Sequence, residues 1–383
     1  MSKPRILFEA GPMMDTHRTG VGYYVGHLFE NLAIYYGEQF EMTGYYFDFL
    51  SHNHKQTPAI PNIKFQNISL VPGKILSVCR RLNFQPYLEL FTQKNTDVVL
   101  FTNYVSLPML RRKPTALIVY DLSFLDCPEF AQPVNLDYLK RFSLPSIQRA
   151  DLIITISEFT KQRLLHYFPD LKAKVIITPI PPVEKTIRRV SLPARLTDLG
   201  IAENKYLLFV STLEPRKNLE NLVNAYAALP LELRNEYSLV LAGGKGWRDE
   251  AIIETITKLQ KDGCKIIRPG YISDEEKEAL YSNASAFVMP SHYEGFGMPL
   301  LEAMQYGIPV VCSDIGVFHE VAGPAAAYFD KDDTNSIASV LKDVLTNPSL
   351  RQQLLTEAPK RLSSYSWKNN AYIVANALQD LAA

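Results

Sequence analysis

Apolar and polar positions alternate along the second half of the chain with two different periods. Short apolar runs, typical of buried strands, are followed by segments in which apolar residues recur every three or four positions, as on one face of a helix. The predicted strands are Tyr206 to Leu213, Ser238 to Ala242, Cys264 to Arg268, Ala286 to Met289, Pro309 to Cys312 and Ala325 to Phe329. The predicted helices are Leu219 to Leu229, Asp249 to Lys261, Asp274 to Asn283 and Met298 to Tyr306, with further helical patterns from Asn335 onward. Strand and helix in turn predict a parallel sheet with helices on both faces.

The first half shows the same alternation less clearly. Its predicted strands are Arg5 to Glu9, Glu41 to Phe47, Val98 to Phe101, Thr115 to Tyr120, Leu152 to Ile156 and Lys174 to Ile177. Its predicted helices are Gly22 to Tyr35, Lys74 to Phe91, Leu136 to Arg149 and Glu158 to Tyr167. Two doubly wound domains in tandem predict a ligand cleft between them, at the carboxyl ends of both sets of strands.

Two terminal signals support the predicted helices. Ser273 and Glu276 have the spacing of a capping box, and Asn347 stands before Pro348 as a cap stands before a proline at the first helical position. The stretch from Thr178 to Lys185 is rich in proline and can continue neither a helix nor a central strand, so we interpret it as the hinge between domains. The boundary then lies near residue 184.

The composition narrows the class of protein. Forty Lys and Arg balance forty Asp and Glu, and 47% of the 383 residues are hydrophobic, which excludes a disordered chain and a polybasic nucleic-acid binder. The first apolar run ends at Gly11, too early for a signal peptide, and no uncharged apolar stretch approaches the roughly 18 residues that cross a bilayer. The cysteines are far apart and predict neither a disulfide framework nor a zinc site: Cys79, Cys127, Cys264 and Cys312. We expect a protein of the reducing cytoplasm.

Two adjacent cations form the first candidate site. Arg216 and Lys217 follow a predicted strand and precede a predicted helix. The unpaired N–H groups at the start of that helix would add to the two side chains in binding an anion. The alternative is a solvated basic turn.

A glycine-containing loop with two carboxylates is the second candidate site. Gly295 and Gly297 allow a ligand to approach the backbone, and Pro299 suits the start of a helix whose N–H groups would face that ligand. Glu294 and Glu302 flank the loop, and carboxylates beside an anion site are suited to accept hydrogen bonds from hydroxyl groups. The alternative is an ordinary helix start with acidic residues near its first turn.

Two further glycine turns are weaker candidates. Gly22 belongs to the sequence Thr19-Gly20-Val21-Gly22, which follows the first strand and could admit a diphosphate, but Val25 stands where a third glycine would complete the dinucleotide-binding pattern. The turn from Gly243 to Gly246 reads as a plain connection between strand and helix.

Together these motifs resemble those of the retaining glycosyltransferases of family 4. The motifs occur in the family's order: Arg216-Lys217-Asn218, Gly243-Gly244, Gly270-Tyr271-Ile272, Glu294-Gly295-Phe296-Gly297, Glu302-Ala303-Met304 and Gly307-Ile308-Pro309-Val310-Val311. Seven residues separate Glu294 from Glu302, as in the paired-glutamate signature of that family. The resemblance covers the second half densely and the first half thinly.

The resemblance implies a GT-B fold, in which two Rossmann-like, doubly wound domains face each other across a cleft. It places the acceptor mainly in residues 1–184 and a nucleotide-sugar donor mainly in residues 185–365, with a helix over residues 366–383 crossing back to the first domain. Arg216 and Lys217 would bind the diphosphate, Glu302 the ribose hydroxyls, and Glu294 with nearby backbone amides the donor sugar. The implied donor-binding set is Gly22, Arg216, Lys217, Tyr271, Ile272, Glu294, Gly295, Phe296, Gly297, Met298, Leu301 and Glu302.

The implied reaction is the transfer of a hexose, with retention, to a saccharide or lipid-linked saccharide in polysaccharide synthesis. On family frequency alone a UDP-hexose is favoured over GDP-mannose. The resemblance implies no cofactor and no essential metal, since cations and helix termini would stabilise the leaving diphosphate. Glu294 looks more like a hydroxyl ligand than a nucleophile, which favours front-side attack. The alternatives are a transferase with a small soluble acceptor and a catalytically inactive module that binds sugar nucleotides.

One residue departs from the family pattern. Many relatives carry a histidine immediately before the aspartate that is Asp121 here, and this chain has Tyr120 instead, a side chain that is uncharged at neutral pH. Tyr120 therefore either positions the donor sugar, alongside Glu294, Arg216 and Lys217 in the catalytic set, or marks different donor contacts.

A basic segment with apolar residues suggests a further partner. Lys74 to Phe91 includes Arg80 and Arg81 among aliphatic side chains, a pattern that suits a helix on an anionic membrane surface. The expected location is the cytoplasm, and peripheral contact with the inner face of the membrane is one of two interpretations of this segment. The alternative is an ordinary helix packed on the first sheet.

Overall fold

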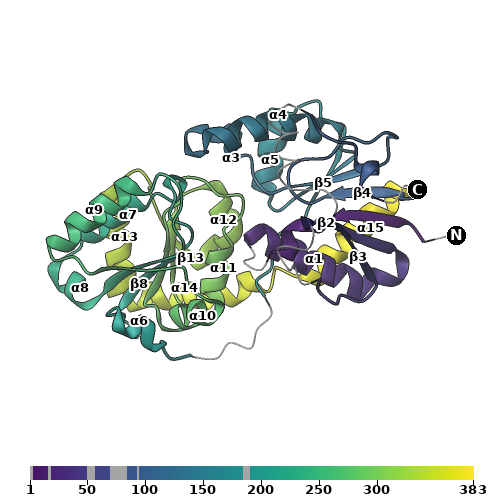
Figure 1. Ribbon diagram of the computed structural model, residues 1–383. Helices are drawn as coiled ribbons and strands as arrows, with labels where there is room; N and C mark the ends of the chain where they lie inside the picture. Colours follow the sequence, from purple (N-terminus) through teal and green to yellow (C-terminus); the bar gives the residue numbers. More distant parts are fainter. Residues whose placement is uncertain (1–2, 16–18, 50–56, 70–83, 93–94, 184–189) are drawn as a thin grey trace. The chain divides into compact units, whose positions relative to one another are not determined.

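A computed structural model describes residues 3–15, 19–49, 57–69, 84–92, 95–183 and 190–383. The chain forms two compact units, each with its own parallel sheet (Figure 1). The first comprises Met1–Ile180 together with Ser366–Ala383, and the second comprises Pro181–Tyr365.

The first unit contains a seven-stranded sheet with the order β3-β2-β1-β4-β5-β6-β7, in which all neighbouring strands run parallel. Its strands are β1 (Arg5–Glu9), β2 (Glu41–Phe47), β3 (Ile63–Ile68), β4 (Val98–Phe101), β5 (Thr115–Val119), β6 (Leu152–Thr155) and β7 (Lys174–Ile177). The chain adds strands in one direction from β1 to β3 and in the other from β4 to β7. The reversal between β1 and β4 is the place where doubly wound sheets bind ligands.

Helices cover both faces of this sheet. They are α1 (Gly20–Tyr36), α3 (Ser123–Asp126), α4 (Pro133–Arg149), α5 (Glu158–Tyr167) and α15 (Trp367–Ala382). α1 packs on the face of β1 that carries Phe8, whose ring stacks on Phe29 with centroids 3.6 Å apart. The last helix, yellow in Figure 1, lies along α1 and buries Trp367 beside Tyr24 and His27. The end of the chain thus completes the unit that the first strands begin.

The second unit repeats the architecture with six parallel strands in the order β10-β9-β8-β11-β12-β13. They are β8 (Tyr206–Val210), β9 (Ser238–Ala242), β10 (Ile266–Gly270), β11 (Ala286–Met289), β12 (Val310–Ser313) and β13 (Ala326–Phe329). The helices are α6 (Ala194–Asp198), α7 (Leu219–Ala227), α8 (Leu231–Glu236), α9 (Glu250–Lys261), α10 (Asp274–Asn283), α11 (Met298–Gln305), α12 (Gly316–Ala322), α13 (Thr334–Thr346) and α14 (Pro348–Leu362). Strand residues such as Leu207, Leu239 and Val288 form one core with the inward faces of α7 and α13.

Both predicted helix starts are confirmed. The Ser273 hydroxyl accepts a hydrogen bond from the Glu276 N–H at 3.2 Å, and the Glu276 carboxylate accepts one from the Ser273 N–H at 2.9 Å. Asn347 caps α14 through the N–H groups of its first turn, with Pro348 at the first helical position. Local sequence therefore determines where these helices begin.

Two predictions for the first unit need correction. β3 was not predicted, because Lys64, Gln66 and Asn67 interrupt its apolar pattern in a half-exposed edge strand. The helix predicted from Lys74 to Phe91 lies partly outside the described residues, which omit 70–83. Its described remainder is not helical before a short 3-10 turn at Leu88–Leu90. Pro86 explains this, since proline disrupts a helix and disfavours helical geometry in the residue before it.

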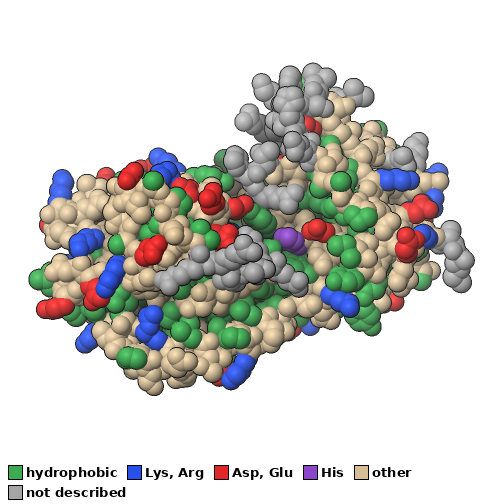
Figure 2. All heavy atoms as spheres, turned by 90° about the horizontal axis from the view of Figure 1, so that it is seen from below, with side chains coloured by type: hydrophobic (Ala, Val, Ile, Leu, Met, Phe, Trp, Pro, Cys, Tyr) green, Lys and Arg blue, Asp and Glu red, His purple; other side chains and the backbone are tan. Residues whose placement is uncertain are grey.

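Charges of both signs are interspersed on the face that Figure 2 shows, as expected for a chain with no net charge. Within the described part of the chain, no helix combines the length and the apolarity needed to cross a membrane.

Candidate functional site

The predicted site of the second unit lies where its sheet reverses direction. β8 is flanked by β9 and β11, so the loops that leave the carboxyl ends of β8 and β11 are neighbours. The first loop ends in a 3-10 turn, Pro215–Lys217, and the second carries Glu294. The His292 N–H donates to the Arg216 carbonyl oxygen at 2.9 Å, and the Arg216 Nη1 donates to the Tyr293 carbonyl oxygen at 2.7 Å. The topology thus joins two motifs that lie far apart in the sequence.

Glycines after β9 hold the loop with the basic motif in place. A Cβ on Gly243 would lie 1.9 Å from the carbonyl oxygen of Ser211, and one on Gly246 would lie 1.9 Å from that of Leu213. The Leu213 N–H also donates to the Gly244 carbonyl oxygen at 3.2 Å. The sequence favoured a plain turn here, but Gly243 and Gly246 are required for the close approach of two backbones.

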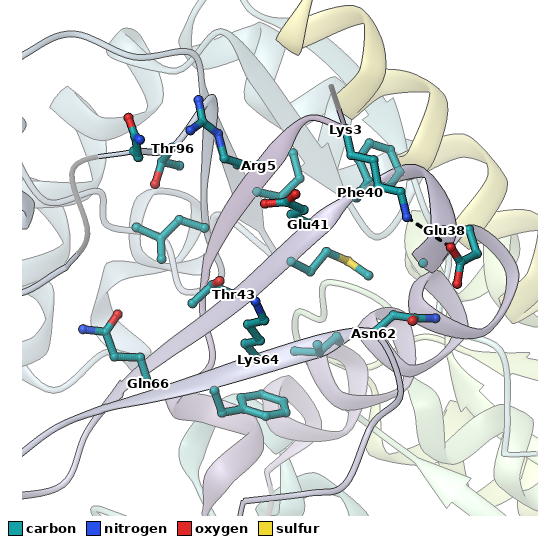
Figure 3. Close-up of a pocket in the computed structure, with 17 residues that line it drawn as sticks. Lys3, Arg5, Glu38, Phe40, Glu41, Thr43, Asn62, Lys64, Gln66 and Thr96 are labelled. Carbon is teal, nitrogen blue, oxygen red and sulfur yellow. Dashed lines mark hydrogen bonds and ion pairs between the residues drawn. The ribbon is translucent and has the colours of Figure 1, made fainter. Parts of the chain in front are cut away.

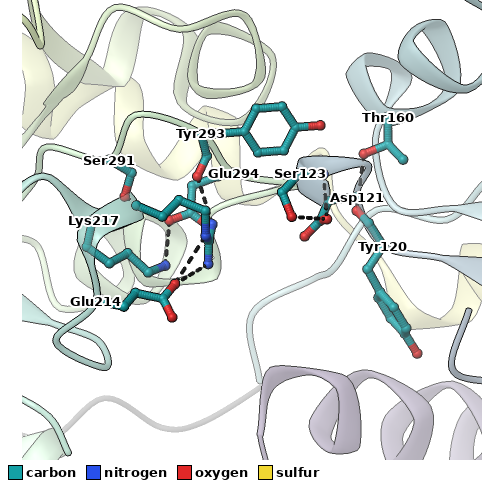
Figure 4. A network of polar contacts seen from close by, with 10 residues as sticks. Tyr120, Asp121, Ser123, Thr160, Glu214, Lys217, Ser291, Tyr293 and Glu294 are labelled. Carbon is teal, nitrogen blue, oxygen red and sulfur yellow. Dashed lines mark hydrogen bonds and ion pairs between the residues drawn. The ribbon is translucent and has the colours of Figure 1, made fainter. Parts of the chain in front are cut away.

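Glu294 is the centre of a buried polar network (Figure 4). Its Oε1 accepts hydrogen bonds from Lys217 Nζ at 2.5 Å and Ser291 Oγ at 2.8 Å, and its Oε2 accepts one from Arg216 Nη1 at 2.9 Å. Burial by itself raises the pKa of this carboxyl. The charges of Arg216 and Lys217, with the hydrogen bonds from Lys217 and Ser291, outweigh burial and lower the pKa to about 2. Glu294 is therefore ionised at neutral pH.

A second carboxylate, Glu214, balances the two cations. Its Oε1 accepts hydrogen bonds from Arg216 Nε at 3.1 Å and Nη2 at 2.7 Å. Burial and the adjacent guanidinium lower the pKa of the Lys217 ammonium group, against the attraction of Glu294 and Glu214. Glu214 was not predicted as a site residue, although its position immediately before Pro215, next to Arg216 and Lys217, was the available signal.

The loop after β11 leads directly into the first turn of α11. Gly297 is the residue before the helix and has φ 101°, a conformation that favours glycine. A Cβ there would lie 2.8 Å from the Phe318 ring. Phe296 is buried, edge-on to Tyr365, and Pro299 occupies the first turn. The first N–H groups of α11 are therefore presented as a site for an anion or a hydroxyl oxygen.

The remaining residues of this predicted loop set differ in exposure. Gly295 is buried within the loop, Met298 opens α11 and is half-buried, and Leu301 is only 1% exposed. Leu301 thus packs in the interior of the unit, and we expect its side chain to support α11.

Glu302, the second carboxylate of the predicted pair, belongs to a separate network. Its Oε1 accepts a hydrogen bond from Lys277 Nζ and its Oε2 accepts one from the Tyr281 hydroxyl, both at 3.0 Å. Both donors lie on α10, directly after the β10 loop that carries Tyr271 and Ile272. Tyr271 is 65% exposed, whereas Ile272 is buried. These two members of the predicted donor-binding set therefore differ, since the Tyr271 ring is exposed to solvent and the Ile272 side chain packs in the core.

Tyr120 lies in the first unit with its side chain buried. Its hydroxyl donates to the Thr102 carbonyl oxygen at 2.8 Å, and its ring meets Tyr24 edge-on with centroids 5.7 Å apart. Burial and the negative charge of Glu9 are among the causes that raise its pKa, so the hydroxyl stays protonated. The hydroxyl proton of Tyr120 is thus engaged in a hydrogen bond inside the first unit.

Gly22 lies in the first turn of α1, because that helix begins at Gly20, two residues earlier than predicted. Gly22 is buried, as is Val25. Thr19 is the residue before α1, and its hydroxyl accepts no hydrogen bond from the N–H groups of the first turn.

Sequence reasoning missed a carboxylate at the reversal point of the first unit. Glu9 ends β1, and its Oε2 accepts a hydrogen bond from the Thr102 N–H at 3.2 Å, while the Thr102 hydroxyl donates to the Glu9 carbonyl oxygen at 2.8 Å. A charged residue at the last position of an apolar strand was the signal that could have found it.

A cavity of about 800 Å³ lies elsewhere in the first unit, at the amino ends of β1, β2 and β3 (Figure 3). Arg5, Glu41, Thr43, Lys64 and Gln66 are among its lining residues, and none of the predicted site residues is. We therefore assign the site from topology and chemistry, not from this cavity. No three His, Cys, Asp or Glu residues of the described chain are grouped as metal ligands.

A family model and two relatives of known name all indicate a glycosyltransferase. The family described as "Glycosyl transferases group 1" matches residues 197–361. The "O-antigen chain mannosyltransferase B" of Escherichia coli is 30% identical over 97% of this chain and 99% of its own length. The "O-antigen chain mannosyltransferase RfbU" of Salmonella typhimurium is 25% identical over 73% of this chain and 72% of its own.

Solved structures show the same fold at low sequence identity. A sucrose-phosphate synthase from Thermosynechococcus elongatus has a TM-score of 0.74 at 18% identity and covers 99% of both chains. WaaG, a glycosyltransferase involved in lipopolysaccharide biosynthesis, has a TM-score of 0.69 at 14% identity and covers 97% of this chain and 99% of its own. The two parallel sheets, the basic motif joined to the glutamate loop and a full-length relative agree, so the chain belongs to the group 1 glycosyl transferases and is a glycosyltransferase with the GT-B fold.

Proposed function

We propose that the protein transfers a hexose from a nucleotide sugar to a saccharide acceptor in polysaccharide synthesis, with retention of configuration and without an essential metal. The observation that carries this proposal is the network of Arg216, Lys217 and Glu294 at the reversal point of the second sheet. The names of one full-length relative and one partial relative, both O-antigen chain mannosyltransferases, support the polysaccharide product.

The leaving diphosphate is bound by the two cations in this proposal. Arg216 and Lys217 lie at the carboxyl end of β8, and the N-terminus of α7 follows them. Negative charge that develops on the diphosphate as the glycosidic bond breaks would be stabilised by groups already in place. Because these cations supply the positive charge, we expect activity to persist in a chelator.

Glu294 binds a hydroxyl of the donor sugar in this proposal and does not attack the anomeric carbon. A carboxylate with a pKa of about 2, tied to two cations and the Ser291 hydroxyl, is a weak nucleophile. This supports front-side attack, in which the departing phosphate oxygen accepts the proton of the acceptor hydroxyl. Tyr120 then acts by packing near its domain's ligand site, not by proton transfer.

The sugar we propose is mannose. The names of these relatives specify mannosyl transfer, whereas the sequence-based preference for a UDP-hexose rested on family frequency. The two donors differ in base as well as in sugar, so nucleotide binding and a transfer assay together separate them.

We also propose a lipid-linked acceptor reached from the cytoplasmic face of a membrane. The Glu89 carboxylate accepts hydrogen bonds from the N–H groups of Leu110 and Arg111 at 3.0 and 3.2 Å, which ties residues 84–91 to residues 108–112. The Arg112 side chain is 81% exposed and forms an ion pair with Asp151 at 2.8 Å. The exposed apolar residues of these two segments are Phe84, Tyr87, Leu90 and Leu110. Apolar side chains next to cations suit an anionic bilayer surface.

Vesicle co-sedimentation tests the membrane contact. Leu90→Asp with Leu110→Asp should release the protein from vesicles that contain anionic lipid. Val134→Asp is the matched control, because Val134 is 80% exposed on α4, outside these two segments. Equal binding of both variants would show that the acceptor is reached without this surface.

The test of the main proposal is calorimetric binding of GDP, UDP and ADP in EDTA, followed by a transfer assay with GDP-mannose and UDP-glucose. Arg216→Ala should weaken binding of the preferred nucleotide by tenfold or more, while Arg112→Ala, a surface arginine of the first unit, should not. Binding without donor hydrolysis or transfer would favour the inactive sugar-nucleotide-binding module. Transfer to a small free sugar alone would favour the soluble-acceptor alternative, and NMR of the product linkage would test retention.

A further inference from the structure

The carboxylate of Glu302 is held by two side chains to which the proposed function gives no role. Lys277 Nζ and the Tyr281 hydroxyl each donate to a different oxygen at 3.0 Å. The Lys277 and Glu302 side chains are 28% and 25% exposed, so this pair lies at the edge of the site and not in the core. A carboxylate has about four lone-pair positions, and these two donors occupy one on each oxygen.

Tyr281 is a rigid member of this group. Its ring stacks on Tyr306 with centroids 5.5 Å apart and an angle of 9° between planes, and it packs against Phe287 at 5.6 Å. The Tyr306 N–H in turn donates to the Glu302 carbonyl oxygen at 3.3 Å. Burial and the nearby Glu302 charge raise the pKa of Tyr281, so its hydroxyl remains a donor. Glu302 is thus fixed through its side chain and its backbone.

We propose that Tyr281 and Lys277 are positioning residues for the ribose of the donor. They hold the Glu302 carboxylate in one orientation, so that its remaining lone pairs meet the two adjacent ribose hydroxyls together. One carboxylate can accept hydrogen bonds from two neighbouring hydroxyl groups only if the plane of the carboxylate is fixed. This inference rests on the proposed function, because Glu302 meets a ribose only if the second unit binds a nucleotide sugar.

A merely structural role would predict a different result. If Tyr281 and Lys277 only tie α10 to α11, their loss would weaken the binding of every nucleotide to the same extent. A positioning role concerns the hydroxyls alone, so a nucleotide that lacks them should bind all variants equally.

The experiment compares the preferred nucleoside diphosphate with its 2′-deoxy and 3′-deoxy counterparts by calorimetry on the full chain. We expect Tyr281→Phe and Lys277→Met each to reduce the preference for the ribonucleotide by about tenfold, with deoxynucleotide binding unchanged. Lys277→Arg should restore most of the preference. In the transfer reaction the same variants should raise KM for the donor and leave kcat unchanged.

Two matched controls remove similar groups away from Glu302. Tyr226→Phe deletes a buried hydroxyl that donates to the Tyr237 carbonyl oxygen at 2.9 Å. Lys205→Met breaks the exposed ion pair with Glu236. Neither should change the preference for ribose. Adding Tyr281→Phe to Glu302→Gln should also cause little further loss, because the first change acts through the second residue.

Three outcomes would overturn the inference. Equal losses for ribonucleotide and deoxynucleotide would show a structural role, and an unchanged preference in both variants would show no role. Failure of the unaltered protein to bind any nucleotide would refute the proposed function as well, which distinguishes the two failures. If Tyr281→Phe does not fold, the half-exposed Lys277→Met variant decides the question.

Discussion

Replacing Glu294 by glutamine tests whether the buried network is held together by charge. Glu294→Gln keeps the shape of the side chain but leaves the cations of Arg216 and Lys217 without their shared carboxylate. Removal of one partner from a buried ion pair costs about 3–5 kcal/mol, because the remaining charge stays buried and uncompensated. The same contacts lower the carboxyl pKa from the ordinary 4.5 to about 2, which corresponds to roughly 3 kcal/mol at neutral pH. We therefore expect the free energy of unfolding of the second unit to fall by about 3 kcal/mol.

The pH dependence gives the sign of the effect. Because the pKa of Glu294 is lower in the folded protein than in the unfolded chain, the unfolded chain binds the proton first as the pH falls. The stabilisation is complete above about pH 5 and is lost as the pH falls from the ordinary pKa of 4.5 to about 2. The glutamine variant has no carboxyl to titrate there, so its stability should depend less on pH over this range.

Urea unfolding at pH 7, 5, 4 and 3 measures both quantities. The chain has two tryptophans, Trp247 in the second unit and Trp367 in the first, so fluorescence in a Trp367→Phe background reports the second unit. Glu236→Gln is the matched control, since its ion pair with Lys205 is exposed and such pairs contribute little. Equal stability of Glu294→Gln and the parent at pH 7, or an unchanged pH profile, would refute the electrostatic account.

Three other substitutions have distinct expected outcomes. Gly246→Ala, whose Cβ would lie 1.9 Å from the Leu213 carbonyl oxygen, should lower the unfolding temperature and weaken nucleotide binding, whereas Gly244→Ala, with nothing within 4 Å, should do neither. Tyr120→Phe should reduce stability by about 1 kcal/mol and leave kcat within a few-fold, because its hydroxyl donates to a backbone carbonyl oxygen; a hundredfold loss of kcat would contradict that role. Trp367→Ala should destabilise the first unit by about 3–5 kcal/mol in thermal unfolding, and an unchanged transition would show that α15 contributes little.

The sequence predicts what depends on neighbouring residues. The strands Arg5–Glu9 and Ser238–Ala242 and the helix Asp274–Asn283 have the predicted limits, because apolar periodicity and caps act over a few positions. The placement of Arg216 and Lys217 between a strand and a helix was predictable for the same reason, because it is a local pattern. Within residues 84–91, the described part of the helix predicted from Lys74 to Phe91, the prediction was wrong because it gave apolar spacing more weight than Pro86, which acts directly on the backbone.

The contacts that define the site were not predictable, because they join loops from different strands. Ser291 completes the network of Arg216, Lys217 and Glu294, yet it is not chemically unusual where it stands in the sequence. The partner of Tyr120 is a backbone carbonyl oxygen at the end of β4, and only the strand order brings that atom to the ring. Residue type and spacing could therefore predict which side chains belong to the site. They could not predict whether the polar atoms of those side chains already form hydrogen bonds or ion pairs within the protein.

The ion pairs that Arg216 and Lys217 already form affect how the proposed donor site would bind a diphosphate. Arg216 and Lys217 are matched by Glu214 and Glu294, so a diphosphate would enter a network whose charges are already balanced. Its binding must then draw on the N-termini of α7 and α11 as well as on the two side chains, and must share the guanidinium with its carboxylates. A carboxylate that keeps its charge while bound to two cations is suited to orient a sugar hydroxyl, and unsuited to leave that network and form a bond to carbon. The same contacts that make Glu294 stabilising in the fold thus argue for front-side attack over a covalent intermediate on this residue.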